Sequence, residues 1–289
     1  MKARRVVGVD LGGTKILAGV VDGDGRIERT VEARTPTTSQ AALVEALVAV
    51  VDELRTPDVA AVGVAVPARV DRDGFALGAV NVPLHGLALP EELGGRLGLP
   101  VGAINDAAAA ALAELRLGAG RGATDLVMLT LGTGVGGGVV IGGRLYDGWA
   151  ELGHMVIVVD GAPCLGACTG RGHVEAYCSG TAADRVAERE LGEGATAREL
   201  VAQRHPALAE IGRYLGAAIG TLVNVFDPEV VVVGGGFGLA AGELLLGPAR
   251  PVVLREALAP GGERVRLALA ELGENAGLIG AALVAPGAA

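Results

Sequence analysis

The sequence predicts an α/β fold made of two related lobes, and two observations support that prediction. Strands alternate with helices along the whole chain, a pattern typical of parallel sheets covered by helices. A strand, a glycine-rich turn and a second strand also come one after another twice, at 7–21 and at 129–141. Glycine lets backbone N–H groups approach an anion closely. Two such hairpins suggest two lobes that hold phosphates for phosphoryl transfer.

The composition permits one or two domains and argues against several classes of partner. Of 289 residues, 51% are hydrophobic and 20% are charged, which suits a large core rather than disorder. A net charge of −9 without a basic cluster argues against nucleic acid as a partner. No apolar run reaches the roughly 18 residues of a membrane span, and the first strand begins too early to leave room for a signal peptide. We therefore expect no membrane partner and a cytoplasmic location.

In the first half of the chain, short apolar runs predict strands. These strands are expected at 5–11, 16–22, 26–34, 59–66 and 101–104. Apolar residues at helical spacing predict a helix at 39–55. Pro67 stops the fourth strand, and the stretch from there to Gly98 is rich in turn residues, with a short helix after Pro90. A strongly helical segment is then expected at 107–115.

The second half repeats the pattern. Strands are expected at 125–131, 135–142, 154–159, 230–233 and 265–270. Helices are expected at 175–191, 196–203, 206–225, 239–255 and 275–285. An irregular cysteine-rich loop covers 160–173. We expect a small N-terminal lobe made of 1–106 and 276–289, and a large lobe at 107–275 that contains this loop.

The residues after each glycine turn exclude two familiar nucleotide-binding motifs. Gly132 to Gly137 formally match the dinucleotide-binding pattern, but that motif must open a helix. Here β-branched residues and the turn at Gly142 and Gly143 come next instead. The segment Gly12 to Lys15 lacks the spacing of a P-loop and also precedes a strand. Both turns are therefore read as β-hairpins.

The segment from Asp10 to Lys15, with the sequence Asp-Leu-Gly-Gly-Thr-Lys, resembles the first phosphate motif of the sugar-kinase and actin-like ATPase superfamily. Glu151-Leu152-Gly153-His154, followed by the cysteine-rich loop and Glu175, resembles the ROK family (repressors, open reading frames and kinases). The resemblance runs along essentially the whole chain. It implies two actin-like (ribonuclease H-like) lobes with an interlobe cleft, and transfer of phosphate from ATP to a sugar.

The resemblance also implies where ATP and Mg²⁺ bind. Asp10 is expected to organise the Mg²⁺ through water. The glycines after the strand at 230–233 open a corner where a flat adenine or ribose could enter. The implied nucleotide-binding residues are Asp10, Gly12, Gly13, Thr14, Lys15, Gly132, Thr133, Gly134, Gly234, Gly235 and Gly236.

A carboxylate at a strand end can accept a proton from a sugar hydroxyl as that hydroxyl attacks the γ-phosphate. Asn105 and Asp106 occupy such a place, although both residue types also favour helix N-caps. The resemblance implies that Asp106 is the general base. The sugar-binding residues that it implies are Asn81, Asn105, Asp106, Glu151, His154 and Glu175. One departure from the family is Ala108, where relatives often have Asn.

The cysteine-rich loop combines soft thiols and imidazoles, which suit a tetrahedral Zn²⁺. Cys164, Cys168 and His173 lie within ten residues of one another, and His154 would supply a fourth ligand. Relatives usually have a cysteine where this chain has His173. We expect a structural Zn²⁺ that orients the sugar-binding residues, and thiols without a metal stay the alternative. Cys178 is expected to be a buried thiol outside the site.

Several functions stay open on the sequence alone. Glucose is the first choice of sugar, with phosphorylation at the 6-hydroxyl, because the loop and Glu175 resemble those of ROK glucokinases. The alternatives are N-acetylmannosamine, N-acetylglucosamine, fructose or allose as substrate, and polyphosphate as donor. A sugar-responsive regulator and a non-catalytic sugar-binding protein are further alternatives. The resemblance also implies a homodimer or homotetramer.

Overall fold

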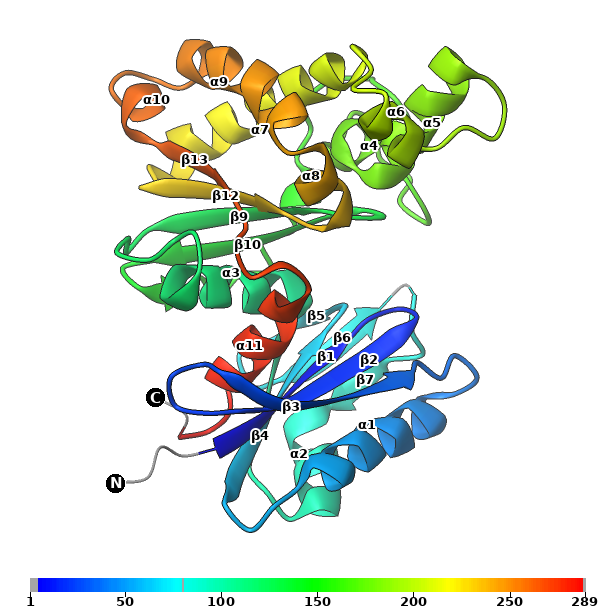
Figure 1. Cartoon of the computed structure of the whole chain (residues 1–289), viewed down its shortest axis with the longest axis vertical. Coiled ribbons are helices and arrows are strands. Elements are labelled where there is room, and N and C mark those ends of the chain that lie inside the picture. The colour runs from blue at the N-terminus through cyan, green and yellow to red at the C-terminus, as the bar shows by residue number, and fades with distance from the viewer. Residues whose placement is uncertain (1–4, 80, 288–289) are drawn as a thin grey trace. The chain divides into compact units, whose positions relative to one another are not determined.

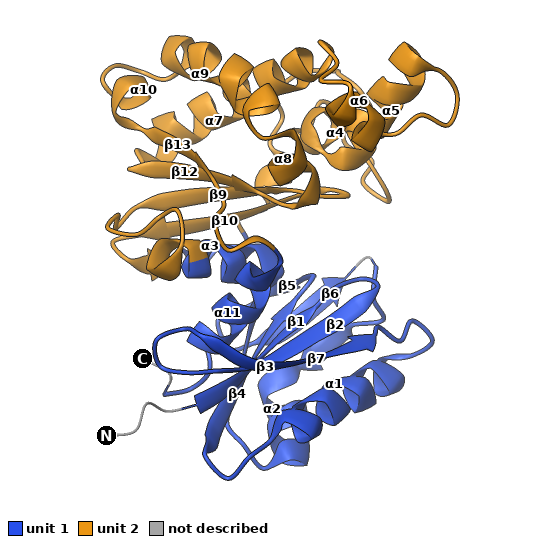
Figure 2. Ribbon diagram, in the orientation of Figure 1, with its two compact units in different colours: residues 1–113, 145–149, 274–289 blue, residues 114–144, 150–273 orange. Residues whose placement is uncertain are grey.

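The computed structural model describes residues 5–79 and 81–287, and the chain forms two compact units (Figures 1 and 2). Unit 1 comprises residues 1–113, 145–149 and 274–289. Unit 2 comprises residues 114–144 and 150–273. The lobe boundaries expected at 106 and 275 stay a prediction.

Unit 1 is built on a five-stranded sheet of order β3-β2-β1-β4-β8. Its strands are β1 (Arg5–Leu11), β2 (Lys15–Val21), β3 (Ile27–Arg34), β4 (Val59–Val66) and β8 (Val101–Asn105). Strands β1, β2 and β3 pair antiparallel, whereas β1, β4 and β8 are parallel. The carboxyl ends of β1, β4 and β8 therefore meet at one edge, which is where ligands bind in open parallel sheets.

One face of this sheet is covered by α1 (Gln40–Leu54) and α2 (Leu89–Leu97) (Figure 1). Helix α1 begins at Ser39, whose hydroxyl accepts a hydrogen bond from the Ala42 N–H at 3.2 Å. Its apolar stripe packs on β1, β2 and β3, as the helical spacing predicts. The buried residues of the stripe are Leu43, Val44, Leu47, Val50, Val51 and Leu54.

The opposite face of the sheet carries α11 (Ala276–Leu283), which packs on β1, β4 and β8. Four glycines stand side by side across neighbouring strands beneath this helix: Gly19, Gly8, Gly63 and Gly102. A Cβ atom at Gly63 would overlap the carbonyl oxygen of Ala281, and one at Gly8 would overlap that of Leu278. We call these four residues the glycine row. They let the helix backbone lie directly on the sheet.

A second, three-stranded antiparallel sheet lies where the sequence predicts only turns and a short helix. It consists of β5 (Ala68–Val70), β6 (Phe75–Ala79) and β7 (His85–Ala88). The Asp71 carboxylate accepts hydrogen bonds from the N–H groups of Asp73 and Phe75, at 3.0 and 2.9 Å. That turn reverses the chain between β5 and β6, so the turn residues mark a hairpin rather than a loop.

Unit 2 contains a sheet of order β11-β10-β9-β12-β13. Its strands are β9 (Leu126–Leu131), β10 (Val135–Ile141), β11 (Arg144–Leu145), β12 (Val230–Gly234) and β13 (Arg266–Leu269). As in unit 1, the two strands that come first in the chain, β9 and β10, form an antiparallel hairpin. Strands β9, β12 and β13 are parallel to one another. The two units therefore share one strand order, as the two hairpins of the sequence predict.

Helices lie on both sides of the unit 2 sheet (Figure 1). They are α3 (Asp106–Leu117), which starts in unit 1, α4 (Glu175–Cys178), α5 (Gly180–Leu191), α6 (Ala197–Ala202), α7 (Leu208–Phe226), α8 (Gly236–Ala241), α9 (Glu243–Glu256) and α10 (Gly261–Arg264). The short 3₁₀ turns are η1 (Leu152–His154) and η2 (Gly273–Asn275). Among the described residues, no helix has both the length and the apolar character to cross a bilayer.

Three sequence predictions in unit 2 are wrong. The strand expected at 154–159 is absent, because this segment folds along the cysteine-rich loop, which it meets in the isolated bridge of Val156 with His173. The helix expected at 175–191 breaks at Ser179, whose extended backbone caps α5. The helix expected at 239–255 breaks at Gly242, which has φ 50° and ψ −123°.

We expect Gly63→Ala to lower the free energy of unfolding by about 3 kcal/mol, because the added methyl group would force α11 away from the sheet. Urea denaturation would measure this change. Gly95→Ala is the matched control, since Gly95 lies in α2 with open space around it. That variant should be as stable as the parent or about 0.5–1 kcal/mol more stable. Equal stability of both variants would contradict close packing at the glycine row.

Candidate functional site

The first glycine hairpin joins β1 to β2 and has a fixed backbone. The N–H of Gly12 donates to the carbonyl of Lys15 at 2.9 Å, which closes the turn. Thr35, at the end of β3, is buried and donates its hydroxyl to the Gly12 carbonyl at 2.7 Å. Its N–H donates to the Thr14 carbonyl at 3.0 Å. Sequence reasoning gave Thr35 no part in holding this hairpin.

Lys15 comes directly after the hairpin, and its ammonium group lies between two carboxylates. The Nζ atom is 3.3 Å from a carboxylate oxygen of Glu32 and 3.4 Å from one of Glu274. The hydrogen bond with Glu32 and that with Glu274 raise the pKa of Lys15. The side chain stays 45% exposed. Its charge is therefore already paired within unit 1.

Asp10 and Asn105 lie at the carboxyl ends of parallel strands, and Asp106 follows Asn105 directly. Asp10 pairs in register with Ala65 on β4, and the next residue of β4, Val66, pairs with Asn105 on β8. The sheet thus gathers three polar side chains from distant parts of the sequence at one edge. The sequence predicts the strand end at Asn105 and Asp106, but not its proximity to Asp10.

The Asn105 side chain both caps α3 and orients Asp106. Its Oδ1 accepts hydrogen bonds from the N–H groups of Ala107 and Ala108 at 3.0 and 3.1 Å. Its Nδ2 donates to Asp106 Oδ1 at 3.0 Å and to the Ala68 carbonyl at 3.2 Å. Asp106 Oδ1 also accepts from the Ala107 N–H at 2.8 Å. Two donors therefore fix the direction of the Asp106 carboxylate.

Asp10 lies in an environment that disfavours its charge. Burial, with a further contribution from the charge of Asp106, raises the pKa of Asp10 from 3.8 to about 7, and Lys15 only partly opposes this rise. Helix α11 contributes to the burial, because a Cβ at Gly277 would overlap the Asp10 carboxylate. A carboxylate that shares an edge with a second carboxylate is suited to bind a cation.

Asn81 lies near the first hairpin but is less constrained than the other predicted residues. It is exposed, and its Cβ lies 3.7 Å from the place that a Cβ on Gly13 would occupy. Asn81 therefore lies at the edge of the residues of unit 1 that are predicted to bind ligands.

The second glycine hairpin, Gly132 to Gly134, joins β9 to β10 in unit 2. The N–H of Gly132 donates to the Gly134 carbonyl at 2.9 Å. Thr181 donates its hydroxyl to the Thr133 carbonyl at 2.8 Å, in the same manner as Thr35 in unit 1. Sequence reasoning also missed Thr181, because no local pattern links it to a turn 48 residues away.

Gly234 to Gly236 lie beside this hairpin, as the sheet requires. Gly234 pairs with Thr130 of β9. Gly235 has φ 80°, and a Cβ there would lie 2.5 Å from the Leu131 carbonyl oxygen. Helix α8 begins at Gly236. The predicted adenosine corner and the second glycine hairpin, which is predicted to hold phosphates, therefore occupy the same edge of one sheet.

Glu151 precedes the short turn η1 and His154 is its last residue, and this turn lies directly on β10. A Cβ at Gly153 would overlap the Val135 carbonyl oxygen, so the turn can approach the strand only through a glycine. Both side chains are exposed. Glu175 opens α4, and its Oε2 accepts a hydrogen bond from the Val135 N–H at 2.8 Å. The three residues predicted to bind the sugar in unit 2 thus surround the end of the second hairpin.

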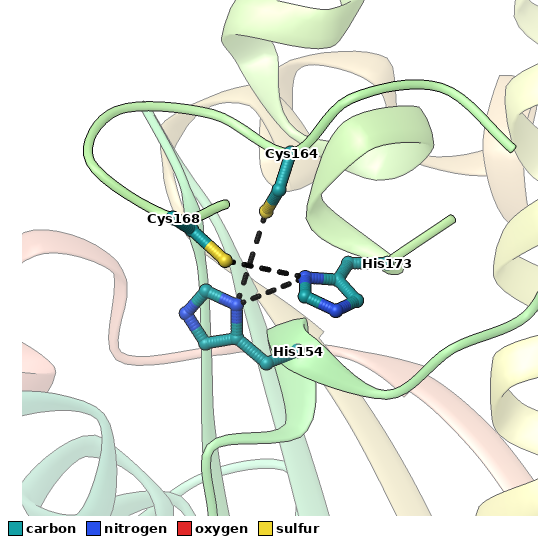
Figure 3. Close-up of side chains that lie close together, drawn as sticks. All are labelled: His154, Cys164, Cys168 and His173. Carbon is teal, nitrogen blue, oxygen red and sulfur yellow. Dashed lines mark hydrogen bonds between the residues drawn. The ribbon is translucent and has the colours of Figure 1, made fainter. Parts of the chain in front are cut away.

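The four predicted metal ligands, His154, Cys164, Cys168 and His173, point toward one another (Figure 3). Their ligand atoms all lie within 4.8 Å of one another. The two Nδ1 atoms are 3.3 Å apart, Cys164 Sγ is 3.8 Å from His154 Nδ1, and Cys168 Sγ is 3.6 Å from His173 Nδ1. A tetrahedral Zn²⁺ would separate two nitrogens by about 3.3 Å and a nitrogen from a sulfur by about 3.6 Å. The cluster therefore has dimensions that fit this ion.

The two buried thiols differ in their surroundings. Burial raises the pKa of the Cys164 thiol to about 11, so a thiolate there needs a nearby cation. Cys178 is fully buried in the core of unit 2, where it approaches the Ile211 carbonyl at 3.9 Å. Burial raises its pKa further. Cys178 thus lies outside the cluster, as expected.

Comparison with known proteins agrees with this geometry. A glucokinase of Streptomyces coelicolor is 36% identical over an alignment 307 positions long, gaps included, which covers 96% of each chain. An N-acetylmannosamine kinase of Shigella flexneri is 37% identical over an alignment 298 positions long, gaps included, which covers 98% of each chain. The crystal structure of a ROK family glucokinase from Streptomyces griseus, in complex with glucose and AMPPNP, has a TM-score of 0.81 and 37% identity. That comparison covers 96% of this chain and 98% of that chain.

The shared strand order, a glycine hairpin in each unit and these likenesses define an α/β protein of the actin-like ATPase fold, which confirms the predicted fold class. The profile of the ROK family matches residues 6–288. The chain belongs to the ROK family.

The raised pKa of Asp10 makes a prediction about stability. The folded protein binds this proton more tightly than the unfolded chain, so the free energy of unfolding should fall as the pH rises from about 4 to about 7. Asp10→Asn removes that fall. At about pH 8 the free energy of unfolding of the variant should exceed that of the parent by about 2 kcal/mol. At about pH 5 this difference between the two proteins should be smaller. Urea denaturation at both pH values would measure it, and a gap independent of pH would contradict the assignment.

The cluster makes a prediction about metal content. Elemental analysis of the purified protein should find about one Zn²⁺ per chain, and Cys168→Ser should lose most of it because one of four ligands is replaced. Cys178→Ala is the control and should keep its zinc, since Cys178 lies in the core. Little zinc in the parent protein, or zinc loss in the control, would refute the proposed ligand set.

Proposed function

We propose that this protein phosphorylates the 6-hydroxyl of glucose with ATP as donor. The observation that carries the proposal is the arrangement of Asp10, Asn105 and Asp106 at the carboxyl edge of the unit 1 sheet. An oriented carboxylate beside a second one suits a general base next to a cation-bound phosphate. Relatives named as sugar kinases match over nearly the whole chain, which supports the same reading.

Asp106 acts as the general base in this proposal. Its Oδ1 is held by the Asn105 amide and the Ala107 N–H, which keeps the carboxylate in one orientation. The carboxylate accepts the proton of the 6-hydroxyl as the hydroxyl oxygen attacks the γ-phosphorus of ATP. The bond from that phosphorus to the β–γ bridging oxygen breaks, and ADP leaves with the electron pair. Asn105, which is itself fixed by Ala68 and α3, holds Asp106 and leaves little freedom for misalignment.

The glycine hairpins would hold the phosphates, because both turns have their backbones fixed by threonine hydroxyls. Gly234 to Gly236 would border the nucleoside. Asp10 would organise a Mg²⁺ through water, and its carboxylate would titrate at a lower pH with the cation present. A bound Mg²⁺ supplies neutralisation of phosphate charge. Lys15 would border the phosphates because it follows the hairpin directly. Its charge is already paired with Glu32 and Glu274.

Glu151, His154 and Glu175 would bind sugar hydroxyls in unit 2, with Asn81 and Asn105 contributing from unit 1. His154 can serve two ligands, because its Nδ1 faces the cysteine-histidine cluster and its ring carries a second nitrogen. A structural Zn²⁺ in the cluster would fix the imidazole ring and the start of α4. The finer assignment of glucose rests on the likeness of the loop and Glu175 to ROK glucokinases. A cytoplasmic location would give the enzyme access to ATP.

The function is tested by measuring ADP release with ATP and Mg²⁺ over glucose, N-acetylmannosamine, N-acetylglucosamine, fructose and allose. Glucose should have the highest kcat/KM. Turnover with N-acetylmannosamine and none with glucose would refute the glucose assignment and make this protein an N-acetylmannosamine kinase, like the relative from Shigella flexneri. Replacing ATP by polyphosphate in the same assay would identify the donor.

Asp106→Asn should lower kcat roughly a thousand-fold, because the amide cannot accept the hydroxyl proton. The fold and the affinity for glucose should change little, as judged by circular dichroism and calorimetry. Asp71→Asn is the matched control: it lies in the β5–β6 turn, where an amide oxygen can also accept the two backbone hydrogen bonds. Unchanged turnover in Asp106→Asn would refute the role of Asp106.

A further inference from the structure

We infer that the cysteine-histidine cluster also controls the second glycine hairpin, so that Zn²⁺ and the nucleotide phosphates bind cooperatively. The connection is the segment 175–181, here called the clamp, which comes after the last ligand of the cluster and contacts the hairpin. This inference rests on the proposed function, which assigns the nucleotide phosphates to that hairpin.

The clamp makes hydrogen bonds along the whole hairpin. The N–H of Gly180 donates to the Gly132 carbonyl at 2.7 Å. The Thr181 hydroxyl donates to the Thr133 carbonyl at 2.8 Å. These bonds direct two carbonyl groups toward the clamp. They therefore help to set the direction of the N–H groups in the turn, which are the groups that would face phosphate oxygens.

Glu175 closes the other side of the hairpin. Its Oε2 accepts a hydrogen bond from the Val135 N–H at 2.8 Å. The carboxylate lies directly against the hairpin backbone, because a Cβ at Gly134 would overlap this carboxylate oxygen. A Cβ at Gly180 would likewise lie 2.9 Å from the Gly132 carbonyl oxygen. A displacement of the clamp would therefore displace the hairpin.

The clamp is in turn built on the cluster. Helix α4 starts at Glu175, two residues after His173, and the His173 carbonyl accepts a hydrogen bond from the Ala176 N–H at 3.0 Å. Glu175 Oε1 is also 3.9 Å from Cys164 Sγ. His173 and Cys164 are two of the four cluster residues. The first turn of the clamp thus takes its position from these two residues.

A cation in the cluster would hold these parts together. Two imidazole Nδ1 atoms 3.3 Å apart can share one proton at most, whereas one ion can bind both nitrogens and both thiolates. Binding of Zn²⁺ would then stabilise the hairpin conformation that accepts phosphate. Coupling of two sites is reciprocal, so the nucleotide must also tighten the binding of Zn²⁺ by the same factor.

The first experiment measures the affinity for MgADP by calorimetry, which needs no turnover. The full-length protein is used in its zinc-loaded form and after chelation of the zinc, with circular dichroism to check the fold. Zinc removal should weaken MgADP binding roughly ten-fold. In the reverse direction, MgADP should slow the transfer of zinc to a chromogenic chelator.

The second experiment cuts the connection without touching the cluster. Thr181→Val keeps the shape of the side chain and removes the hydrogen bond to the Thr133 carbonyl. It should weaken MgADP binding about five-fold, with zinc content and glucose affinity unchanged. Thr221→Val is the matched control, since the Thr221 hydroxyl bonds only the Ala217 carbonyl of its own helix, at 3.1 Å.

The outcomes separate this inference from the proposed function. If MgADP binds Thr181→Val as tightly as the Thr221→Val control, the clamp does not set the hairpin and the inference fails. The same holds if zinc-free protein that is still folded binds MgADP as tightly as the loaded form. In both cases the proposed kinase stands. Absence of MgADP binding to the zinc-loaded parent protein would overturn the inference and the proposed function together.

Discussion

The geometry of unit 1 depends on how closely α11 approaches the sheet. The glycine row leaves no side chain at Gly8, Gly63 and Gly102, so the backbone of α11 lies close to β1, β4 and β8. The same helix meets α3 through Gly280, where a Cβ would overlap the Ala109 carbonyl oxygen, and meets Asp10 at Gly277. One helix therefore fixes the elements that carry Asp10, Asn105 and Asp106 relative to one another. The same packing contributes to the burial that raises the pKa of Asp10.

The two units support their glycine hairpins with threonine residues from different parts of the fold. In each unit a carbonyl group of the hairpin accepts a hydrogen bond from a threonine hydroxyl that is distant in the sequence. In unit 1 the donor, Thr35, ends the third strand of the same sheet, so the sheet itself supports the turn. In unit 2 the donor, Thr181, comes from a segment that lies just after the cysteine-histidine cluster. The shared strand order thus permits different support, and only the second hairpin is connected to the cysteine-histidine cluster.

Much of the fold could be predicted from local pattern, because buried strands and amphipathic helices have their own periodicities. The strands that hold Asp10 and Asn105 lie where apolar runs indicate. The antiparallel sheet at 68–88 was missed because its strands are short and its turn residues resemble a loop. The predicted helix at 175–191 runs through Ser179 and Gly180, although serine is favoured at a helix N-cap, which is the place that Ser179 takes. The four residues of the cysteine-histidine cluster could be named from their chemistry. Thr35 and Thr181 could not, because their contacts are made only by the tertiary fold.

The place of α11 in the chain has a consequence for the order of folding during synthesis. Unit 2 has all its residues once position 273 has left the ribosome. Unit 1 begins first but must wait for residues 276–283, because until then the glycine row has no helix to cover it. Domains made of one continuous segment can fold from the N-terminus onward during translation. Here the later unit can be finished first, and the nascent sheet of unit 1 stays open on one face for most of translation.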